Sequence, residues 1–226
     1  MKASIHQPNF LPYLGIFDKI RHSELLVIYD VAQYVRDRFD NRNQIKTERG
    51  PIWLTIPLRV KDSFLRRFHE TPLPPEDYWK EKHLKTIRQN YCRAPYFDRY
   101  FPDIERIYLR PHASLAGISI AFIEYLMDKF AIRTPVVKTS DLGLDLNLKS
   151  SEMLLEILRR VNATDYLAGA SGRKYMDMAV MDRAGIRVEF QHFVHPTYRQ
   201  IHGEFIPNLA AIDLLFNEGD ASKDFV

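Results

Sequence analysis

The stretch that most constrains the fold is residues 5–18, which read Ile-His-Gln-Pro-Asn-Phe-Leu-Pro-Tyr-Leu-Gly-Ile-Phe-Asp. It predicts a buried strand over residues 2–5, a loop, and a helix that opens at Pro12, because proline fixes a helical φ and its missing N–H is not needed in the first turn. A core segment has no need of the polar side chains of His6, Gln7 and Asn9. Since a helix N-terminus offers free N–H groups and positive potential, we predict that these three residues line a small-molecule site.

A second strand follows this helix. Residues 25–29 form a continuous apolar run, which is typical of a strand buried on both faces of a parallel sheet. The run ends at Asp30, so the first thirty residues predict a right-handed β-α-β unit. His6 and Asp30 then lie at the carboxyl ends of parallel strands, the edge at which open α/β sheets bind ligands.

The rest of the chain predicts more helices and strands. Residues 31–50 are polar and charged, residues 52–58 alternate like a strand, and the Pro-rich segment 60–75 is typical of an exposed excursion. Apolar periodicity predicts helices over 76–91, 97–109 and 114–130. Short strands over 135–138, 165–168 and 187–194 alternate with helices over 150–161, capped by Ser150 or Ser151, and 173–183, before a last helix at 210–217. The predicted fold class is α/β: a Rossmann-like, mostly parallel sheet in a single domain, 1–226, with a helical elaboration at about 60–132.

Composition and charge narrow the function classes. A net charge of +3 without a run of like charges gives no argument for nucleic acid, but it permits anionic substrates. The single Cys92 allows no intramolecular disulfide and fits a reducing compartment. Residues 1–20 lack a signal-peptide pattern, and charged residues interrupt the most apolar stretch, 115–132. We expect a cytoplasmic protein without membrane insertion.

Three polar clusters are candidate sites. His6 at a strand end suits phosphate binding or general acid/base chemistry, although His6, Gln7 and Asn9 also suit a plain turn. Asn41, Arg42, Asn43 and Lys46 suit phosphate or carboxylate binding, the alternative being a solvated loop. The turn with Ser171 and Gly172 suits an anion cradle or an ordinary strand-to-helix turn, and it matches neither a Walker A loop nor a nucleophile elbow.

The other histidines are weaker candidates for a catalytic or metal-binding role. His83 lies on an apolar helical stripe with Trp79 and Ile87, a pattern that favours a core residue over a catalyst. His192 and His195 have no Cys or carboxylate spacing that completes a zinc site, so we predict no metal there. The His195-Pro196 pair is better interpreted as a turn that orients Tyr198.

Nearly the whole chain, in order, resembles the WbqC-like family. The resemblance begins with the specific motif of residues 6–15. It continues through Asp30 with Gln33-Tyr34, residues 41–46, Trp53-Leu54-Thr55, Lys82-His83, residues 94–97, residues 166–169, His195-Pro196 with Tyr198 and Gln200, and residues 213–217. The family occurs in bacterial surface-polysaccharide (O-antigen) gene clusters, which implies a role in making or decorating glycans. The family's paired aspartates are absent here, because Val31 and Ala32 follow Asp30.

The opening unit also looks like the start of nucleotidylyltransferases and pantothenate-synthetase-like ligases, in which histidines at a helix N-terminus bind ATP phosphates. The second histidine of that motif is missing, since residues 7–15 contain none. This similarity is one of architecture and is not evidence of activity.

The preferred hypothesis is a transferase of glycan or nucleotide-sugar metabolism that transfers an acyl or aminoacyl group to an amino sugar, with ATP as a candidate cofactor. The alternatives are a nucleotidylyltransferase and a non-catalytic sugar-nucleotide-binding or scaffolding module. A homo-oligomer is compatible with all three. The candidate catalytic residues are His6, Asp30, Lys46 and His83, and the candidate substrate-binding residues are Gln7, Asn9, Tyr13, Gln33, Asn41, Arg42, Asn43, Ser171, Gly172, His195 and Tyr198. In this hypothesis His6 is the general acid/base, Asp30 binds ribose hydroxyls or a cation, and His6, Asp30, Asn41, Arg42 and Lys46 converge on one cleft.

Overall fold

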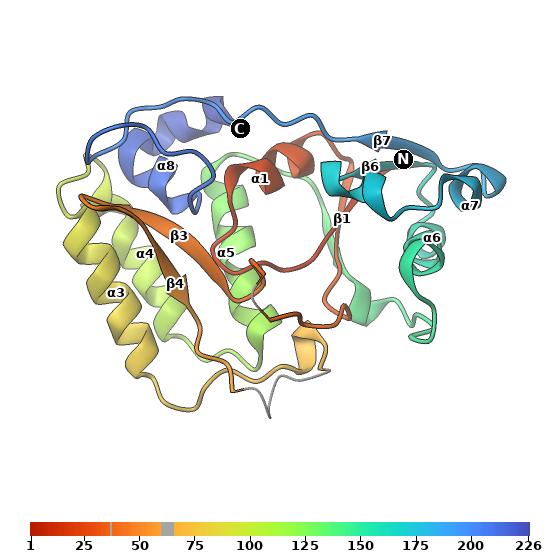
Figure 1. The fold of residues 1–226 in the computed structure, drawn as a ribbon, viewed down its shortest axis with the longest axis horizontal. Helices are drawn as coiled ribbons and strands as arrows, with labels where there is room; N and C mark the ends of the chain where they lie inside the picture. Colours follow the sequence, from red (N-terminus) through yellow and green to blue (C-terminus); the bar gives the residue numbers. More distant parts are fainter. Residues whose placement is uncertain (37, 60–65) are drawn as a thin grey trace.

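The computed structural model describes residues 1–36, 38–59 and 66–226 (Figure 1). Its centre is a parallel sheet of five strands, in the order β5-β2-β1-β6-β7. Helices cover both faces of the sheet, so the predicted Rossmann-like α/β fold is confirmed. The strands are β1 (Lys2–His6), β2 (Leu25–Ile28), β5 (Val136–Lys138), β6 (Asp165–Ala168) and β7 (Arg187–Phe190).

The central strands are apolar on both sides because each side has its own core. In β2, Leu26 and Ile28 belong to one hydrophobic cluster, whereas Val27 belongs to the other. The first cluster joins the sheet to α1 (Leu14–Arg21), α3 (Tyr78–Tyr91), α4 (Phe97–Leu109), α5 (Leu115–Lys129) and α8 (Ile212–Glu218). The second joins it to α6 (Ser150–Arg160) and α7 (Met178–Arg183), on the opposite side in Figure 1.

The order of the strands creates a switch point beside β1. From β1 the chain moves outward through β2 to β5, and it then returns to the other edge of β1 with β6 and continues to β7. The connections that leave the carboxyl ends of β1 and β6 therefore diverge. In open α/β sheets this divergence is where ligands bind. The loop after His6 and the turn after Ala168 both start at this point.

The polar segment 31–50 contains a strand that periodicity does not predict. Within it, β3 (Arg42–Thr47) pairs antiparallel with β4 (Gly50–Thr55), as the hairpin in front of the helices in Figure 1. Side-chain amides compensate for the weak strand pattern, since Asn41 donates to the Ile56 carbonyl and Asn43 to the Leu11 carbonyl. The predicted strand 52–58 accordingly begins earlier, at Gly50, and ends earlier, at Thr55.

Several element boundaries differ from the sequence prediction. Helix α1 begins at Leu14 rather than Pro12, because Leu11 has a positive φ of 48° and Tyr13 forms a β-bridge with Ala210. Neither serine caps α6, whose N-cap is Lys149; the Ser151 hydroxyl instead accepts from the Asp177 N–H. The predicted helix 173–183 is split into η3 (Ala170–Lys174) and α7, and the predicted strand 187–194 ends at Phe190.

Part of the Pro-rich segment 60–75 is not an exposed excursion. Residues 60–65, where the predicted helical elaboration also starts, lie outside the described residues. Farther along, η1 (Phe68–Glu70) buries Phe68, and Thr71 is fully buried. The remaining short elements are η2 (Thr139–Asp141) and η4 (Gly219–Phe225). No helix in the described ranges is long and apolar enough to cross a membrane.

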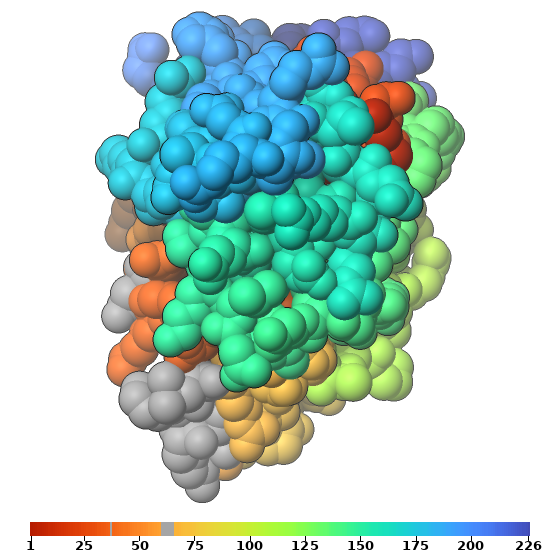
Figure 2. Space-filling view, turned by 90° about the vertical axis from the view of Figure 1, so that its right-hand side faces the viewer, coloured from red at the N-terminus to blue at the C-terminus, as the bar shows by residue number. Residues whose placement is uncertain are grey.

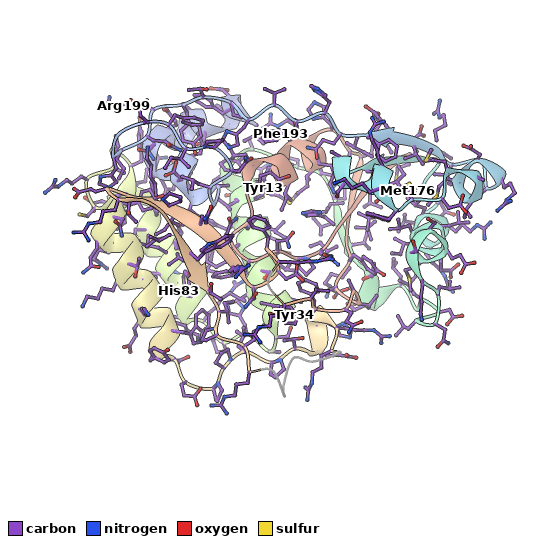
Figure 3. The ribbon with its side chains drawn as sticks, viewed as in Figure 1. Tyr13, Tyr34, His83, Met176, Phe193 and Arg199 are labelled. Carbon is purple, nitrogen blue, oxygen red and sulfur yellow. The ribbon has the colours of Figure 1, made fainter. Side chains whose placement is uncertain are left out.

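His83 is a core residue of the helical layer. Its ring packs against Trp79 and Phe10 at centroid distances of 5.4 and 6.0 Å (His83 is labelled in Figure 3). The Nε2–H donates to the Thr55 carbonyl at 3.1 Å, which leaves Nδ1 to accept from the Tyr108 hydroxyl at 3.3 Å. Burial lowers the pKa of His83 to about 4, against the opposing effect of the Thr55 bond.

A buried polar network ties the hairpin to the end of the chain. The carboxylate of Asp213, which is 0% exposed, accepts from the hydroxyls of Tyr91 and Tyr198 at 2.7 and 2.8 Å and from Gln200 Nε2 at 2.9 Å. The ammonium of Lys46, on β3, donates to Gln200 Oε1 at 3.0 Å and to the Glu204 carbonyl at 2.6 Å. A buried acid and a buried base are therefore bridged by one glutamine side chain.

We predict that Asp213→Ala lowers the free energy of unfolding by roughly 3–5 kcal/mol, because it leaves two tyrosine hydroxyls and the buried Lys46 ammonium uncompensated. Urea titration followed by circular dichroism measures this loss. The matched control is Asp182→Ala at an exposed carboxylate of α7, for which a change within about 0.5 kcal/mol is expected. A loss below about 1 kcal/mol for Asp213→Ala would show that the network is not a stabilising centre.

His83 predicts a pH-dependent contribution to stability. Its pKa is about 4 in the folded protein and about 6.5 in the unfolded chain. Between these values the unfolded chain binds the extra proton, so the contribution is complete above pH 6.5 and is lost as the pH falls toward 4. The difference in unfolding free energy between wild type and His83→Leu is expected to be smaller at pH 5 than at pH 7.5, by about 2 kcal/mol. A difference that does not change with pH contradicts this account.

Candidate functional site

A cleft opens at the switch point, where β1 ends and α1 begins. It has two lobes, of about 640 and 680 Å³, which is within the usual range for small-molecule sites. Both lobes are lined by His6, Tyr13, Ile16, Arg38 and Asn208, so they form one continuous space. We call this space the switch-point cleft.

His6 lies between the sheet and α1. Ala3 and Ile5 of β1 pack on the α6 side, so the alternation of the strand turns His6 toward α1. There Lys19 Nζ lies 3.2 Å from His6 Nδ1 and donates to the Ile5 carbonyl at 3.0 Å. Burial, followed by the charge of Lys19, holds the pKa of His6 well below its usual value. The ring is therefore neutral at pH 7.

The first lobe is bounded by the loop after β1 and by the hairpin. Asn9 donates to Asp40 Oδ1 at 3.4 Å, and the other oxygen of this carboxylate accepts from the Val35 N–H at 3.1 Å. Burial raises the pKa of Asp40 to about 6, although the Val35 bond and the charge of Arg38 act in the opposite direction. The amide of Asn43 also lines this lobe.

Tyr13 forms the wall that the two lobes share. Its ring lies over the first turn of α1, where a Cβ on Gly15 would come within 2.6 Å of it, so this close approach requires glycine. The ring also packs in a T-shaped arrangement against Phe193 at a centroid distance of 6.2 Å (both are labelled in Figure 3). Burial, and then the charge of Asp18, raises the pKa of Tyr13, so the hydroxyl is protonated at neutral pH.

The second lobe runs toward β6 and α6. It is lined by Gln7 and Lys19 from the opening unit and by Ser171 from the turn after β6. Gln191, just after β7, donates to the Gly15 carbonyl at 2.7 Å and thereby joins the far side of the sheet to α1. Residues of the later part of the chain, coloured green to blue, cover this side of the molecule in Figure 2.

A third hollow of about 480 Å³ lies next to the second lobe, with which it shares Tyr29 and Ser150. Gln33 lines this hollow, and a β-bridge joins it to Arg67. Gln33 thus lies near the cleft without lining either of its lobes.

Asp30 and Lys46 do not belong to the cleft, so the expected convergence is wrong for both. Asp30 accepts three hydrogen bonds, from the Thr139 hydroxyl and from the N–H and hydroxyl of Ser140, at 2.7–2.8 Å. It joins the carboxyl ends of β2 and β5 and is 2% exposed. Lys46 is bound within the Asp213 network. Neither side chain lines either lobe.

The Asn-Arg-Asn segment is divided in the same way. Asn43 lines the first lobe, but Asn41 is buried against Ile56 and Arg42 stacks over the Trp53 ring at 4.6 Å on the hairpin. Arg42 and Trp53 are diagonal cross-strand neighbours in the register of β3 and β4. Of the five residues expected to converge, only His6 lines the cleft.

The remaining candidates pack outside the two lobes. His83 belongs to the helical core, and Tyr198 is bonded to Asp213. His195 packs against Tyr198 and Phe205 at centroid distances of 6.1 and 5.7 Å. Gly172 is buried, and a Cβ there would lie 3.3 Å from the Phe190 ring, so it serves packing beside the lining residue Ser171.

Sequence reasoning missed Lys19, Asn208 and the lining role of Arg38. Lys19 follows Gly15 by four residues, so one face of α1 carries both, but that spacing is not distinctive in a helix of eight residues. Asn208 has a left-handed φ of 61°, a conformation that asparagine tolerates, and it reaches the cleft from far along the chain. Only tertiary contact reveals it.

The arrangement favours an anionic or polar ligand with a flat or apolar part. A neutral imidazole, a buried ammonium and amide groups offer hydrogen-bond donors, while Tyr13, Ile16 and Phe39 offer apolar surface. In the described ranges, no three His, Cys, Asp or Glu side chains gather where they would hold a metal ion.

Comparison with known proteins relates the chain to one family. The model of the WbqC-like protein family matches residues 7–225. The chain is 32% identical to the uncharacterized protein Rv1507c of Mycobacterium tuberculosis over 227 aligned positions, which cover 100% of this chain and 97% of that protein. The match includes every residue that lines the cleft from Gln7 onward. The chain belongs to the WbqC-like family.

Proposed function

We propose that this protein is an enzyme of bacterial glycan metabolism that binds a nucleotide-linked amino sugar in the switch-point cleft and transfers an acyl or aminoacyl group to it. The observation that carries the proposal is His6 Nε2, a buried nitrogen at the carboxyl end of β1 for which no described group is a hydrogen-bond partner. Such an atom at a ligand-binding edge of the sheet is a group that substrate would satisfy.

The size and chemistry of the cleft support this class of substrate. Its two lobes are continuous, so one can hold the nucleotide and the other the sugar and the acyl donor. Donors from Gln7, Asn9 and Asn208 suit the hydroxyls of a sugar, and the exposed Arg38 suits a phosphate. Cytoplasmic location and the surface-polysaccharide context follow from this proposal.

His6 supports the transfer as a hydrogen-bond donor. When the amine of the sugar attacks the acyl carbonyl, a C–N bond forms and negative charge develops on the carbonyl oxygen, which an Nε2–H stabilises. The bond from the carbonyl carbon to its leaving group then breaks, and the leaving group takes the electron pair and the proton that the attacking amine gives up. The Nδ1 lone pair is bonded to Lys19, and Nε2 carries the hydrogen. Of the predicted acid/base role, donation from Nε2–H therefore fits this geometry better than acceptance of a proton. ATP would serve to activate the acyl donor.

A nucleotidylyltransferase is the second candidate, because a histidine at the end of β1 beside a lysine in the last turn of α1 also suits phosphate oxygens. That enzyme would transfer a nucleoside monophosphate from a nucleoside triphosphate to a sugar phosphate and release pyrophosphate. A sugar-nucleotide-binding module would bind the same ligands without turnover.

The test combines ligand binding with turnover. Purified protein is screened by thermal shift with ATP, UDP-sugars and dTDP-sugars at millimolar concentration. The nucleotides and nucleotide sugars that bind are then incubated with the protein and with amino acids or acyl donors, and products are identified by mass spectrometry. We expect an acylated sugar and a fall in kcat of about 10²–10⁴-fold in His6→Ala, with ligand binding retained. His192→Gln, at an exposed histidine, is the matched control and should keep wild-type kcat.

Each other outcome counts against the proposal. Pyrophosphate release without an acylated product selects the nucleotidylyltransferase. Binding by wild type without any product selects the binding module. The absence of a thermal shift with every nucleotide overturns the nucleotide-linked substrate.

A further inference from the structure

The Lys19 ammonium is buried without a counter-charge. The side chain is 3% exposed, and its Nζ contacts only the Ile5 carbonyl and His6 Nδ1 among the described groups, neither of which carries a negative charge. Burial lowers the pKa of Lys19 to about 8, and no carboxylate of the described residues opposes this shift. Burying a charge without a partner is costly, and buried charges in proteins are normally paired.

The same contact determines which nitrogen of His6 carries the proton. An ammonium has donors only, so Nδ1 of the neutral ring must accept from it and the hydrogen must lie on Nε2. This Nε2–H is the buried donor for which no described acceptor exists. Both side chains line the second lobe. Because Nδ1 and Nε2 of an imidazole point away from each other across the ring, Lys19 offers a charged donor on one side of the ring and His6 a neutral donor on the other.

Carboxylates near the cleft are engaged elsewhere. Asp40, in the first lobe, accepts from Val35 and Asn9. Asp18, adjacent to Lys19 in α1, accepts from Gln191 Nε2 at 2.5 Å and faces His22 Nδ1 at 3.4 Å. Neither compensates Lys19.

We infer that Lys19 Nζ binds one anionic group of the ligand, a phosphate or a carboxylate, in the second lobe, while the His6 Nε2–H, whose position Lys19 fixes, donates to another group of the same ligand. The inference deepens the proposed function and rests on it for the rest of the ligand. A phosphate oxygen there belongs to the nucleotide, whereas a carboxylate belongs to an amino acid donor. Lys19 is then a substrate-binding residue that also fixes the His6 tautomer.

The experiment uses simple anions, so that it does not depend on knowledge of the substrate. Binding of inorganic phosphate, pyrophosphate and acetate is measured by isothermal titration calorimetry at constant ionic strength for wild type, Lys19→Met and Lys85→Met. Methionine keeps the length of the side chain and removes the charge, and Lys85 is an exposed lysine of α3 that serves as the control. Long-range ¹H–¹⁵N spectra report the His6 tautomer in parallel.

We expect at least one anion to bind wild type and Lys85→Met equally, with Kd raised about tenfold or more in Lys19→Met. In wild type the His6 hydrogen should lie on Nε2, and the resonance of Nδ1, which contacts Lys19, should shift when the anion is added. The anion that binds more tightly, phosphate or acetate, identifies the group that occupies the site. Equal binding by Lys19→Met and wild type, or a hydrogen on Nδ1 in wild type, would overturn the inference.

Failure of the anion site and failure of the proposed transferase give different results. Anion binding that depends on Lys19, without any acyl transfer, supports the site and rejects the transferase. Acyl transfer with an unchanged KM in Lys19→Met supports the transferase and rejects the site.

Discussion

The constraint on which the structure depends is the pairing of β1 with a parallel strand along each edge. Because β2 and β6 both hydrogen-bond to β1, this strand is buried on both faces and both edges, and its apolar residues serve the core. Its carboxyl end is the exception. The chain leaves β1 and β6 toward opposite sides there, and the space between the two connections becomes the cleft. The site is thus a consequence of strand order and is not an addition to the fold.

Polar side chains of the same types either hold the protein together or line the cleft, and the sequence does not distinguish these two purposes. Asn41 and Asn43 hold backbone carbonyls, Asp30 joins two strand ends, and Asp213 collects two tyrosine hydroxyls and a glutamine. Each of these groups is buried and its hydrogen-bonding capacity is used within the protein. A buried polar group must find partners, so residue types that suit a ligand are equally suited to tie distant segments together.

In the cleft, by contrast, polar groups are left without full hydrogen-bonding or charge partners among the described residues. His6 Nε2 has no described partner, and among the described groups the Lys19 ammonium bonds only to the neutral Ile5 carbonyl and His6 Nδ1. A low local dielectric makes both costly for the folded state and strengthens their attraction for an anion. In this respect the pair around β1 differs from Lys46, whose ammonium is held by Gln200 and the Glu204 carbonyl close to Asp213. These two buried lysines therefore differ: the ammonium of Lys46 is bonded near a carboxylate, whereas no described carboxylate contacts that of Lys19.

The sequence by itself determined the α/β class, the opening β-α-β unit, the three successive helices and membership in the WbqC-like family, because apolar periodicity and a specific motif are local properties of the chain. It also placed His6, Asn9 and Tyr13 at the mouth of a strand-to-helix turn. It did not reveal the β3–β4 hairpin, whose polar strand is stabilised by hydrogen bonds from the side-chain amides of Asn41 and Asn43 to backbone carbonyls outside the strand. Only the tertiary structure decided that the side chains of Asp30 and Lys46 are bonded outside the cleft, that Asn208 reaches the cleft from the far end of the chain, and that Lys19 contacts His6. Those outcomes depend on which groups meet in space, and contacts between residues of different elements leave no periodic trace in the sequence.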